Sequence, residues 1–244
     1  MQTFLYSPDD CDGRFIVVKA AEARHMKAVL RLKTGDMVRL IDGQGTAHLC
    51  QIDGFKGKDV LCSIIKTVRR SGEADISLTL AAGLSSGYKF DVVIEKGTEA
   101  GISRFVPLLT DKGKVKVEES AKLKRKMNRW RRVAEAAAKQ SGRSVIPEIS
   151  EPVKFSDYIS GVDKAHTWLF HPQTGESRSN WPKYSVAEVT VVIGPESGFS
   201  PAEIELAKQR NINIISIGDR ILRTETAGII IPALFIYLAD SVKE

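Results

Sequence analysis

The pattern of hydrophobic and polar positions changes near residue 76. Before that point, short runs with strand character span residues 14–18, 37–41, 47–52 and 60–67, and Asp-Gly pairs at 42–43 and 53–54 mark turns. One short helix is expected over residues 21–31. The pattern therefore predicts a small β-barrel over residues 1–70, and residues 68–75 are polar and unpatterned like a linker.

From residue 76 onward, strands and helices alternate. Residues 76–83 are almost continuously apolar, as in a strand that is buried on both faces. Further short strands are expected at residues 104–109, 167–170, 189–193 and 212–217. Helical segments lie between or after these strands, which favours parallel pairing. The sequence therefore predicts an α/β domain with a mostly parallel sheet over residues 76–244.

Two of the expected helices have distinctive compositions. The helix within residues 112–143 has one apolar stripe at helical spacing, made of Leu123, Met127, Trp130, Ala134 and Ala137. The last helix, residues 226–242, is apolar nearly all round, and such a helix is expected to be buried on every side. Its most apolar run, residues 229–238, is too short to span a membrane and contains Pro232.

Composition narrows the class of protein. The 244 residues are 43% hydrophobic and 27% charged, which is typical of a soluble globular chain with a sizeable core. The first residues lack the basic and apolar regions of a signal peptide. Three cysteines, Cys11, Cys50 and Cys62, form no CxxC pair, and four histidines are scattered. These features favour the cytoplasm and exclude a disulfide scaffold, and no metal site is expected.

The positive charge is concentrated in one segment. The net charge is +6, and residues 112–143 contain twelve Lys and Arg residues against three acidic ones, which leaves about −3 for the rest. Arg125, Arg129 and Arg132 recur on one helix face, away from the apolar stripe. A solvated helix face has the same composition, but a row of arginines suits the phosphates of a nucleic acid better than solubility alone.

Two loops that contain glycine connect a strand to a helix. The first is GPESGFSPAE at residues 194–203, where Ser200 and Glu203 form a capping box and Pro201 occupies the first helical position. Ligands of open α/β sheets bind at the carboxyl ends of strands, so this loop is a candidate binding loop. An ordinary turn between a strand and a helix has the same glycines.

The second loop is IGDRILRTETAG at residues 217–228, in which Ile221 and Leu222 are apolar and Thr224 is the expected N-cap of the last helix. An apolar loop suits a flat adenine or a thioether better than a triphosphate. The chain has no P-loop lysine and no GxGxxG after a strand. These absences argue against a dinucleotide-binding fold and against an ordinary Rossmann-type methyltransferase.

Together, the two loops resemble the paired signature of the SPOUT methyltransferases. The nearest resemblance is to the 16S rRNA (uracil-N3)-methyltransferase (RsmE) family, and RILRTETA in register with GPExGFS is its specific part. The resemblance covers the whole chain. HMKAVLRL at 25–32 resembles the PUA-like barrel, EKGTEAG at 95–101 the first helix of the methyltransferase domain, and RVAEAA at 132–137 the basic helix.

This resemblance implies a carboxy-terminal trefoil knot, a topology that general fold rules do not predict. It also implies that S-adenosylmethionine binds within the loops of the knot, and that the chain forms a homodimer through this domain. The implied cofactor-binding residues are Leu169, Phe170, His171, Pro172, Gly194, Pro195, Glu196, Gly198, Phe199, Ile217, Gly218, Ile221 and Leu222.

The implied reaction is methylation of N3 of a uridine in 16S rRNA of the small ribosomal subunit. Because N3 must lose its proton, a cation near the ring is expected, and Arg223 is the candidate. Glu225 is the candidate for orienting that cation or accepting the proton, although a first-turn helix charge needs no catalytic role. The base must be unpaired or flipped out. The candidates for RNA binding are Arg24, Arg31, Arg125, Arg129, Arg132 and Arg143.

One position departs from the family pattern. Ser197 stands where the family loop usually reads GPEGG, and a serine there costs ~1–2 kcal/mol if its φ is positive. Two alternative functions remain open on the sequence alone. One is a SPOUT ribose 2′-O-methyltransferase acting on rRNA or tRNA, and the other is a non-catalytic RNA-binding protein.

Overall fold

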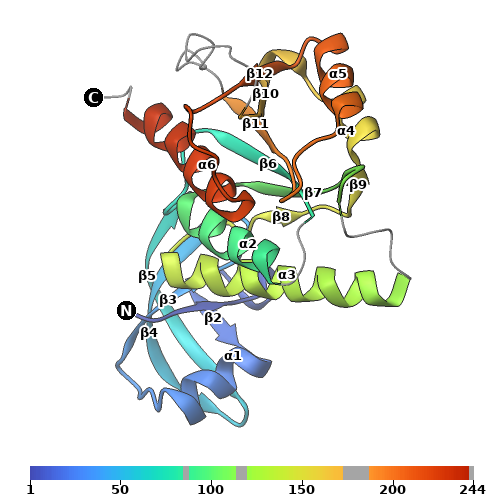
Figure 1. Cartoon of the computed structure of the whole chain (residues 1–244). Helices are drawn as coiled ribbons and strands as arrows, with labels where there is room; N and C mark the ends of the chain where they lie inside the picture. The colour runs from blue at the N-terminus through green and yellow to red at the C-terminus, as the bar shows by residue number, and fades with distance from the viewer. Residues whose placement is uncertain (85–87, 114–119, 173–186, 242–244) are drawn as a thin grey trace. The chain divides into compact units, whose positions relative to one another are not determined.

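Residues 1–73 and 135–146 form one structural unit, and residues 74–134 and 147–244 form another. The computed structural model in Figure 1 describes residues 1–84, 88–113, 120–172 and 187–241. The division at residues 1–70 and 76–244 stays a prediction, and residues 135–146 pack with the first unit. Within the described ranges, no helix combines the length and the apolarity that crossing a membrane requires.

The first unit is built on a five-stranded sheet in the order β1-β3-β4-β5-β2, in which only the β1–β3 pair is parallel. Its strands are β1 (Thr3–Leu5), β2 (Phe15–Val18), β3 (Met37–Ile41), β4 (Thr46–Lys56) and β5 (Asp59–Arg69). Short helices are η1 (Pro8–Asp10), α1 (Ala20–Arg24) and the π-helix η2 (His25–Val29). The four predicted strands and the helix are confirmed, whereas β1 is absent from the prediction.

The core of this unit includes two of the cysteines. Cys50 and Cys62 are fully buried among apolar side chains of β2 to β5. Burial raises the pKa of each thiol to about 12, so both stay protonated and unreactive at neutral pH. They act as small apolar residues of the core.

A buried ion pair closes this unit on itself. Arg143 is 2% exposed and donates from Nη2 to Oε2 of Glu73 at 2.7 Å, and from Nε to the same oxygen at 3.1 Å. The other oxygen, Oε1, accepts the backbone N–H groups of Ser144 and Val145, each at 2.9 Å. The expected linker at 68–75 is therefore structured, and both oxygens of its Glu73 carboxylate accept hydrogen bonds.

The second unit is a parallel sheet of seven strands in the order β12-β10-β11-β6-β7-β8, with β9 also paired to β7. The strands are β6 (Ser77–Gly83), β7 (Arg104–Leu109), β8 (Glu148–Ile149), β9 (Val153–Lys154), β10 (Thr167–Phe170), β11 (Glu188–Ile193) and β12 (Asn213–Ile215). The predicted α/β architecture with a parallel sheet is confirmed. The strand at 212–217 is shorter than expected.

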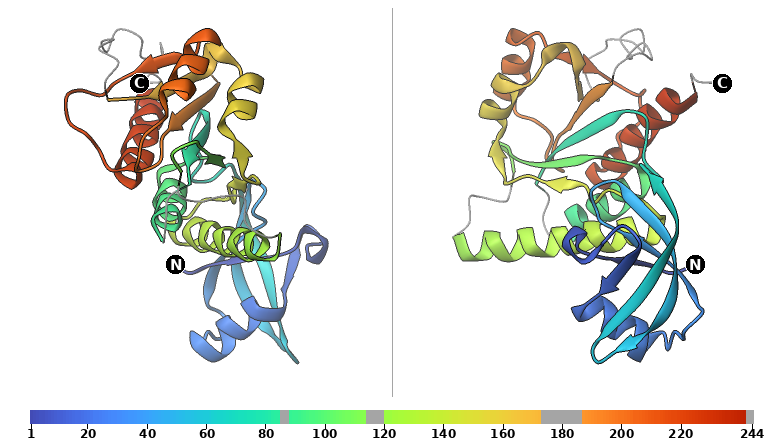
Figure 2. Two further views of the ribbon diagram at one scale, coloured as in Figure 1. Left: turned by 45° about the vertical axis from the view of Figure 1, so that its right-hand side comes forward. Right: turned by 180° about the vertical axis from the view of Figure 1, so that it is seen from behind.

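Helices lie against this sheet in two groups (Figure 2). α2 (Lys89–Ala100) and α6 (Thr224–Asp240) pack against each other, and α6 contacts β6 and β11. α4 (Phe155–Gly161) and α5 (Pro201–Gln209) pack against each other and contact β7 and β12 respectively. A short η3 (Lys164–His166) precedes β10.

α3 (Ser120–Ser141) is the basic helix. Its predicted stripe is confirmed, because Met127, Trp130, Ala134 and Ala137 are buried and Leu123 is partly buried. Trp130 also donates from its ring N–H to Asp91 on α2 at 2.9 Å. The stripe therefore anchors the helix, and the remaining faces carry its positive charge.

The last helix corrects two predictions. The N-cap of α6 is Arg223, not Thr224, which is the first helical residue and is buried. The expected burial on every side is wrong for this chain, because Ile230, Leu234 and Tyr237 are 43%, 39% and 68% exposed. These three residues, which we call the α6 stripe, recur at helical spacing. Val242, the expected helix end, lies outside the described residues.

A candidate active site at the ends of three parallel strands

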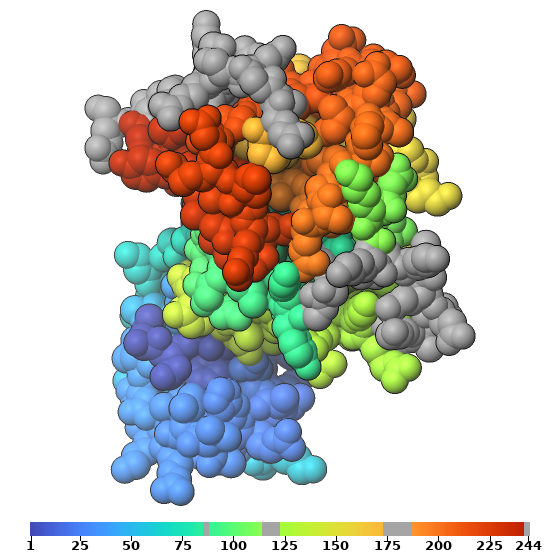
Figure 3. Space-filling model, in the orientation of Figure 1, coloured from blue at the N-terminus to red at the C-terminus, as the bar shows by residue number. Residues whose placement is uncertain are grey.

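A pocket of about 820 Å³ opens where β10, β11 and β12 end. The three neighbouring strands run parallel, so the segments that follow them meet at one edge of the sheet. These segments are His171–Pro172, residues 194–200 and residues 216–223. On the molecular surface, the orange residues around 190–220 lie beside the red residues of α6 (Figure 3).

Most of the predicted cofactor-binding residues line this pocket: Phe170, His171, Pro172, Gly194, Pro195, Glu196, Gly198, Phe199, Ile217, Ile221 and Leu222. Leu169 and Gly218 do not line it. Leu169 is fully buried in the core under the pocket, and Gly218 gives its loop a positive φ of 123°. The contact of these two residues with a ligand stays a prediction.

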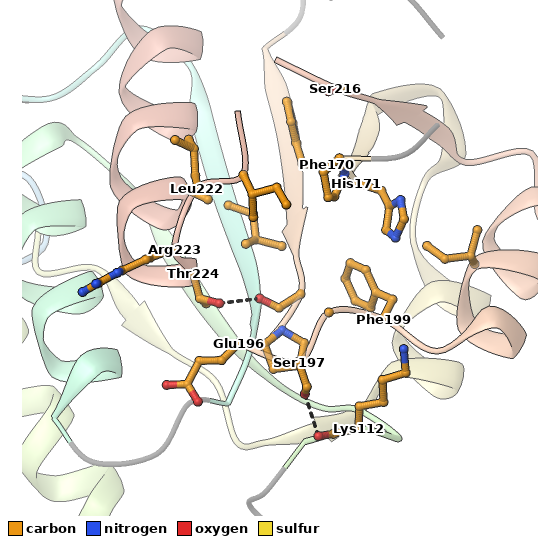
Figure 4. A pocket seen from close by; sticks show the side chains of 18 of the residues that line it. Lys112, Phe170, His171, Glu196, Ser197, Phe199, Ser216, Leu222, Arg223 and Thr224 are labelled. Carbon is orange, nitrogen blue, oxygen red and sulfur yellow. Dashed lines mark hydrogen bonds between the residues drawn. The ribbon is translucent and has the colours of Figure 1, made fainter. Parts of the chain in front are cut away.

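The loop after β11 fits tightly against the end of β6. A Cβ atom at Gly83 would lie 2.4 Å from the backbone nitrogen of Pro195, far inside contact distance. Thr224, at the start of α6, donates from Oγ1 to the carbonyl oxygen of Gly194 at 3.2 Å (Figure 4). The floor of the pocket thus depends on a glycine on β6, and α6 is tied to the same loop.

Replacing Gly83 with alanine is expected to destabilise the protein by about 1–3 kcal/mol, because the methyl group meets backbone that cannot rotate away. It should also weaken ligand binding in the pocket, since Pro195 must shift. Urea unfolding measures the first effect and calorimetry the second. Gly161→Ala is the matched control, because nothing lies within 4 Å of the added methyl group. Equal stability of the two variants would contradict the expectation.

Ser197 adopts its position without backbone strain. It is not among the described non-glycine residues with positive φ, whereas Gly198 has a φ of 68°. The expected αL penalty therefore falls on the glycine, which tolerates it. The serine hydroxyl donates to the carbonyl oxygen of Lys112 at 2.7 Å. The departure from GPEGG thus adds a contact to the segment after β7.

The capping box predicted at the start of α5 is confirmed, and it extends to a residue absent from the prediction. The Ser200 hydroxyl accepts the N–H of Glu203 at 3.1 Å and donates to Oδ2 of Asp111 at 2.7 Å. The Glu203 carboxylate accepts the N–H of Ser200 at 2.7 Å and that of Asp111 at 2.9 Å. Because Ser200 and Glu203 are buried, this closed network fixes the loop and Asp111 together.

Both predicted catalytic residues line the pocket. Arg223 is exposed, and among the described residues no carboxylate pairs with it. Its side chain extends away from Phe199 and His171 (Figure 4). Glu225 is partly buried, and its Oε2 atom is buried without a hydrogen-bond partner among the residues that the structure describes. A cation and an unsatisfied carboxylate therefore lie two residues apart at the start of α6.

Among the described residues, four further cations line the pocket and are absent from the site prediction: Lys89, Lys112, Lys208 and Arg220. Lys89 at the start of α2 forms an ion pair with Glu196. No local pattern marks Lys89 in particular, because its partner Glu196 lies in a loop more than a hundred residues away.

His171 is expected to be neutral at neutral pH. Burial lowers the pKa of its imidazole below the ordinary value of 6.5, and the charge of Lys112 lowers it further. The unfolded chain therefore protonates this imidazole at a higher pH than the folded chain does. The free energy of unfolding is expected to decrease as the pH falls below 6.5. NMR titration should give a midpoint below 6.5 that rises in Lys112→Gln. A midpoint unaffected by Lys112→Gln would contradict the electrostatic effect of Lys112 on this imidazole.

The predicted RNA-binding arginines divide into two groups. Arg24, Arg31, Arg125, Arg129 and Arg132 are exposed. Arg129 pairs with Asp91, and its guanidinium lies 4.4 Å from the ring centre of Tyr88. The prediction for Arg143 is wrong, because this side chain is buried on Glu73 and does not face solvent. No group of three or more potential metal ligands occurs among the described residues.

Known protein families match both units. A model of an RNA methyltransferase domain matches residues 72–236, and a model of an RNA methyltransferase PUA domain matches residues 18–65. The chain belongs to the RNA methyltransferase family. The first match contains the whole pocket, and the second covers most of the five-stranded sheet.

Relatives of this RNA methyltransferase include proteins named ribosomal RNA small subunit methyltransferase E. The Rickettsia conorii protein is 31% identical over 214 residues, which are 84% of this chain and 82% of that protein. The Synechocystis protein is 30% identical over 230 residues, 91% of this chain and 72% of that protein. A Legionella pneumophila methyltransferase, solved with bound S-adenosylmethionine, is 27% identical with a TM-score of 0.85, covering 96% of both chains.

Proposed function

We propose that this RNA methyltransferase transfers the methyl group of S-adenosylmethionine to N3 of a uridine in 16S rRNA of the small ribosomal subunit. The observation that carries the proposal is the pocket at the ends of β10, β11 and β12, with Arg223 and Glu225 in its wall. Relatives named as small-subunit methyltransferases support the choice of substrate. A ribosomal substrate also supports a cytoplasmic location.

The residues of the pocket fit S-adenosylmethionine. The volume of the pocket lies within the range of about 300–1,000 Å³ that is usual for small-ligand pockets. Phe170, Phe199 and Leu222 supply apolar walls for an adenine, and the loops supply backbone donors and acceptors. A Cβ at Gly194 would stand 3.2 Å from the Phe199 ring, so a side chain at this position would press against the apolar wall. We assign cofactor binding first to the predicted residues that line the pocket.

The bound cofactor supplies an electrophilic methyl group on a sulfonium, so the chain mainly has to position the acceptor and handle its proton. We assign Arg223 to stabilise the negative charge that the uracil ring acquires when N3–H ionises. The buried Oε2 of Glu225 has no partner among the described residues and is suited to accept that proton or to orient Arg223. Thr224 lies between them and holds the start of α6 against Gly194.

The exposed arginines support an RNA substrate. Arg125, Arg129 and Arg132 on α3 and Arg24 and Arg31 in the first unit are proposed to bind phosphates around the target. Because N3 lies on the Watson–Crick edge, the target base has to leave its pair before it enters the pocket. We also propose the trefoil knot for the second unit, and this part of the proposal rests on the resemblance of residues 194–203 and 217–228 to the paired loops of the SPOUT methyltransferases.

A homodimer is proposed to cover the α6 stripe. Ile230, Leu234 and Tyr237 form an exposed apolar row on an otherwise well-packed helix. Leu234→Glu should shift the protein from dimer to monomer in sedimentation velocity, because a carboxylate cannot be buried at such an interface without a partner. Lys154→Glu, at an exposed position of β9, is the control for a change of charge. A monomeric wild type would reject the proposal.

The test of the proposed function uses 16S rRNA and small subunits from cells that lack the protein. After incubation with S-adenosylmethionine, nucleoside mass spectrometry should detect 3-methyluridine, and reverse transcription should stop at one uridine. A 2′-O-methylated nucleoside without a strong stop would replace the proposal by ribose methylation. Absence of methyl transfer, together with absence of cofactor binding in calorimetry, would leave an RNA-binding protein.

A further inference from the structure

Lys112 is an exposed lysine that lines the pocket from the segment after β7. Its side chain extends toward Phe199 and His171 (Figure 4). Its charge is close enough to His171 to lower the pKa of that imidazole. Lys112 is therefore a cation of the pocket wall and not only the first residue of the basic segment.

The backbone around Lys112 is fixed to the loop after β11. The Ser197 hydroxyl donates to the Lys112 carbonyl at 2.7 Å. The preceding residue, Asp111, is bonded through its carboxylate to Ser200 at 2.7 Å and through its N–H to Glu203 at 2.9 Å. Three hydrogen bonds therefore hold two consecutive residues against the loop that forms the pocket.

The charge of Lys112 is available to a ligand. Lys89, another lysine of the pocket, is neutralised by Glu196. Among the described acidic side chains, none forms an ion pair with Lys112. An exposed ammonium on a flexible stem binds phosphate as a point charge. Lys112 also begins the run of twelve basic residues between positions 112 and 143, which favours RNA over a small anion.

We propose that Lys112 binds a phosphate group of the RNA nucleotide that enters the pocket, and that Ser197 is the positioning residue that fixes Lys112 to the cofactor loop. This inference rests on the proposed function, because it takes RNA as the substrate. The same loop then sets the place of both ligands, so the distance between the cofactor and the bound nucleotide does not depend on the rest of the basic segment.

The first test measures the binding of a fluorescein-labelled single-stranded oligouridylate to the full chain over a salt series. Lys112→Gln should lower the slope of log K against log salt by about 1, because one phosphate contact is lost. Lys112→Arg should keep the slope. With small subunits as substrate, Lys112→Gln should raise KM roughly tenfold with little change in kcat. Lys154→Gln removes the same charge on exposed β9 and should change neither quantity appreciably.

The second test addresses Ser197. Ser197→Ala should weaken RNA binding, and Ser197→Thr, which keeps the hydroxyl, should restore it. In the Lys112→Gln background, Ser197→Ala should have no further effect on RNA binding, because the residue acts through the lysine. Additive effects of the two substitutions would overturn the positioning role.

Calorimetry with S-adenosylhomocysteine separates the possible partners of Lys112. If Lys112→Gln weakens cofactor binding and leaves the salt slope of RNA binding unchanged, the lysine binds the cofactor carboxylate and the inference is wrong. A wild type that binds the oligouridylate through Lys112 but transfers no methyl group would reject the proposed function alone. An unchanged slope in an enzyme that methylates RNA would reject only the inference.

Discussion

Replacing Arg223 with alanine is expected to lower kcat by about 10²- to 10³-fold, the usual effect of removing one donor that stabilises a developing anion. The guanidinium lies in the wall of the pocket and has no carboxylate partner in the described part of the chain, so its charge is available to the uracil ring. Cofactor affinity should change little, because the arginine acts on the acceptor. Single-turnover transfer of a labelled methyl group, with calorimetry in parallel, measures both quantities.

Two further variants sharpen this test. Arg223→Lys keeps the charge but loses the planar fork, and it should recover part of the lost rate. Arg210→Ala removes an exposed arginine at the end of α5, outside the pocket, and should behave like the wild type. If Arg223→Ala retained nearly the full rate, the proposed charge stabilisation would be wrong.

Replacing Arg143 with methionine is expected to destabilise the first unit by about 3–5 kcal/mol, because Glu73 would keep a buried charge without its partner. The carboxylate would retain the two N–H groups of Ser144 and Val145, which places the cost toward the lower end of that range. Urea unfolding followed by circular dichroism measures the loss.

The exposed ion pair of Arg104 and Glu148 is the control for the buried pair, and it shows how much of the expected loss of stability comes from burial. Their side chains are 50% and 62% exposed at a separation of 3.4 Å, so Arg104→Met should cost less than about 1 kcal/mol. Replacing Arg143 with Met and Glu73 with Gln together should recover part of the lost stability, since no unpaired charge remains and the amide oxygen can still accept the two N–H groups. A small effect of Arg143→Met alone would contradict the structural role.

The sequence predicts the elements of this protein better than it predicts which charges are free. Runs such as 104–109 and 167–170 have the apolar pattern of buried strands, and the structure places strands there. β1 has only three residues and pairs with a strand more than thirty positions away, so no local period marks it. The α6 stripe is apolar like the buried faces of its helix, so composition cannot tell exposed positions from covered ones.

The roles of the basic residues depend on partners that are distant in sequence. Arg143 follows the row of arginines on α3, but Glu73, seventy positions earlier, takes it out of solvent. Lys112 belongs to the same basic segment, and hydrogen bonds of Lys112 and Asp111 to residues 197–203 hold it in the pocket wall. The resemblance to the family supplied the cofactor and the proposed knot, because residue period and composition contain no information about how strands thread.

The contacts of Glu73 also determine how the protein can be dissected. The first unit is discontinuous in sequence, so a fragment that ends near residue 75 would lack residues 135–146. It would carry the Glu73 carboxylate without the guanidinium and the two N–H groups that satisfy it in the intact chain. An isolated amino-terminal fragment is therefore a poor surrogate for this unit in RNA-binding assays. Limited proteolysis should leave the first unit folded only if residues 1–73 and residues 135–146 both stay uncut.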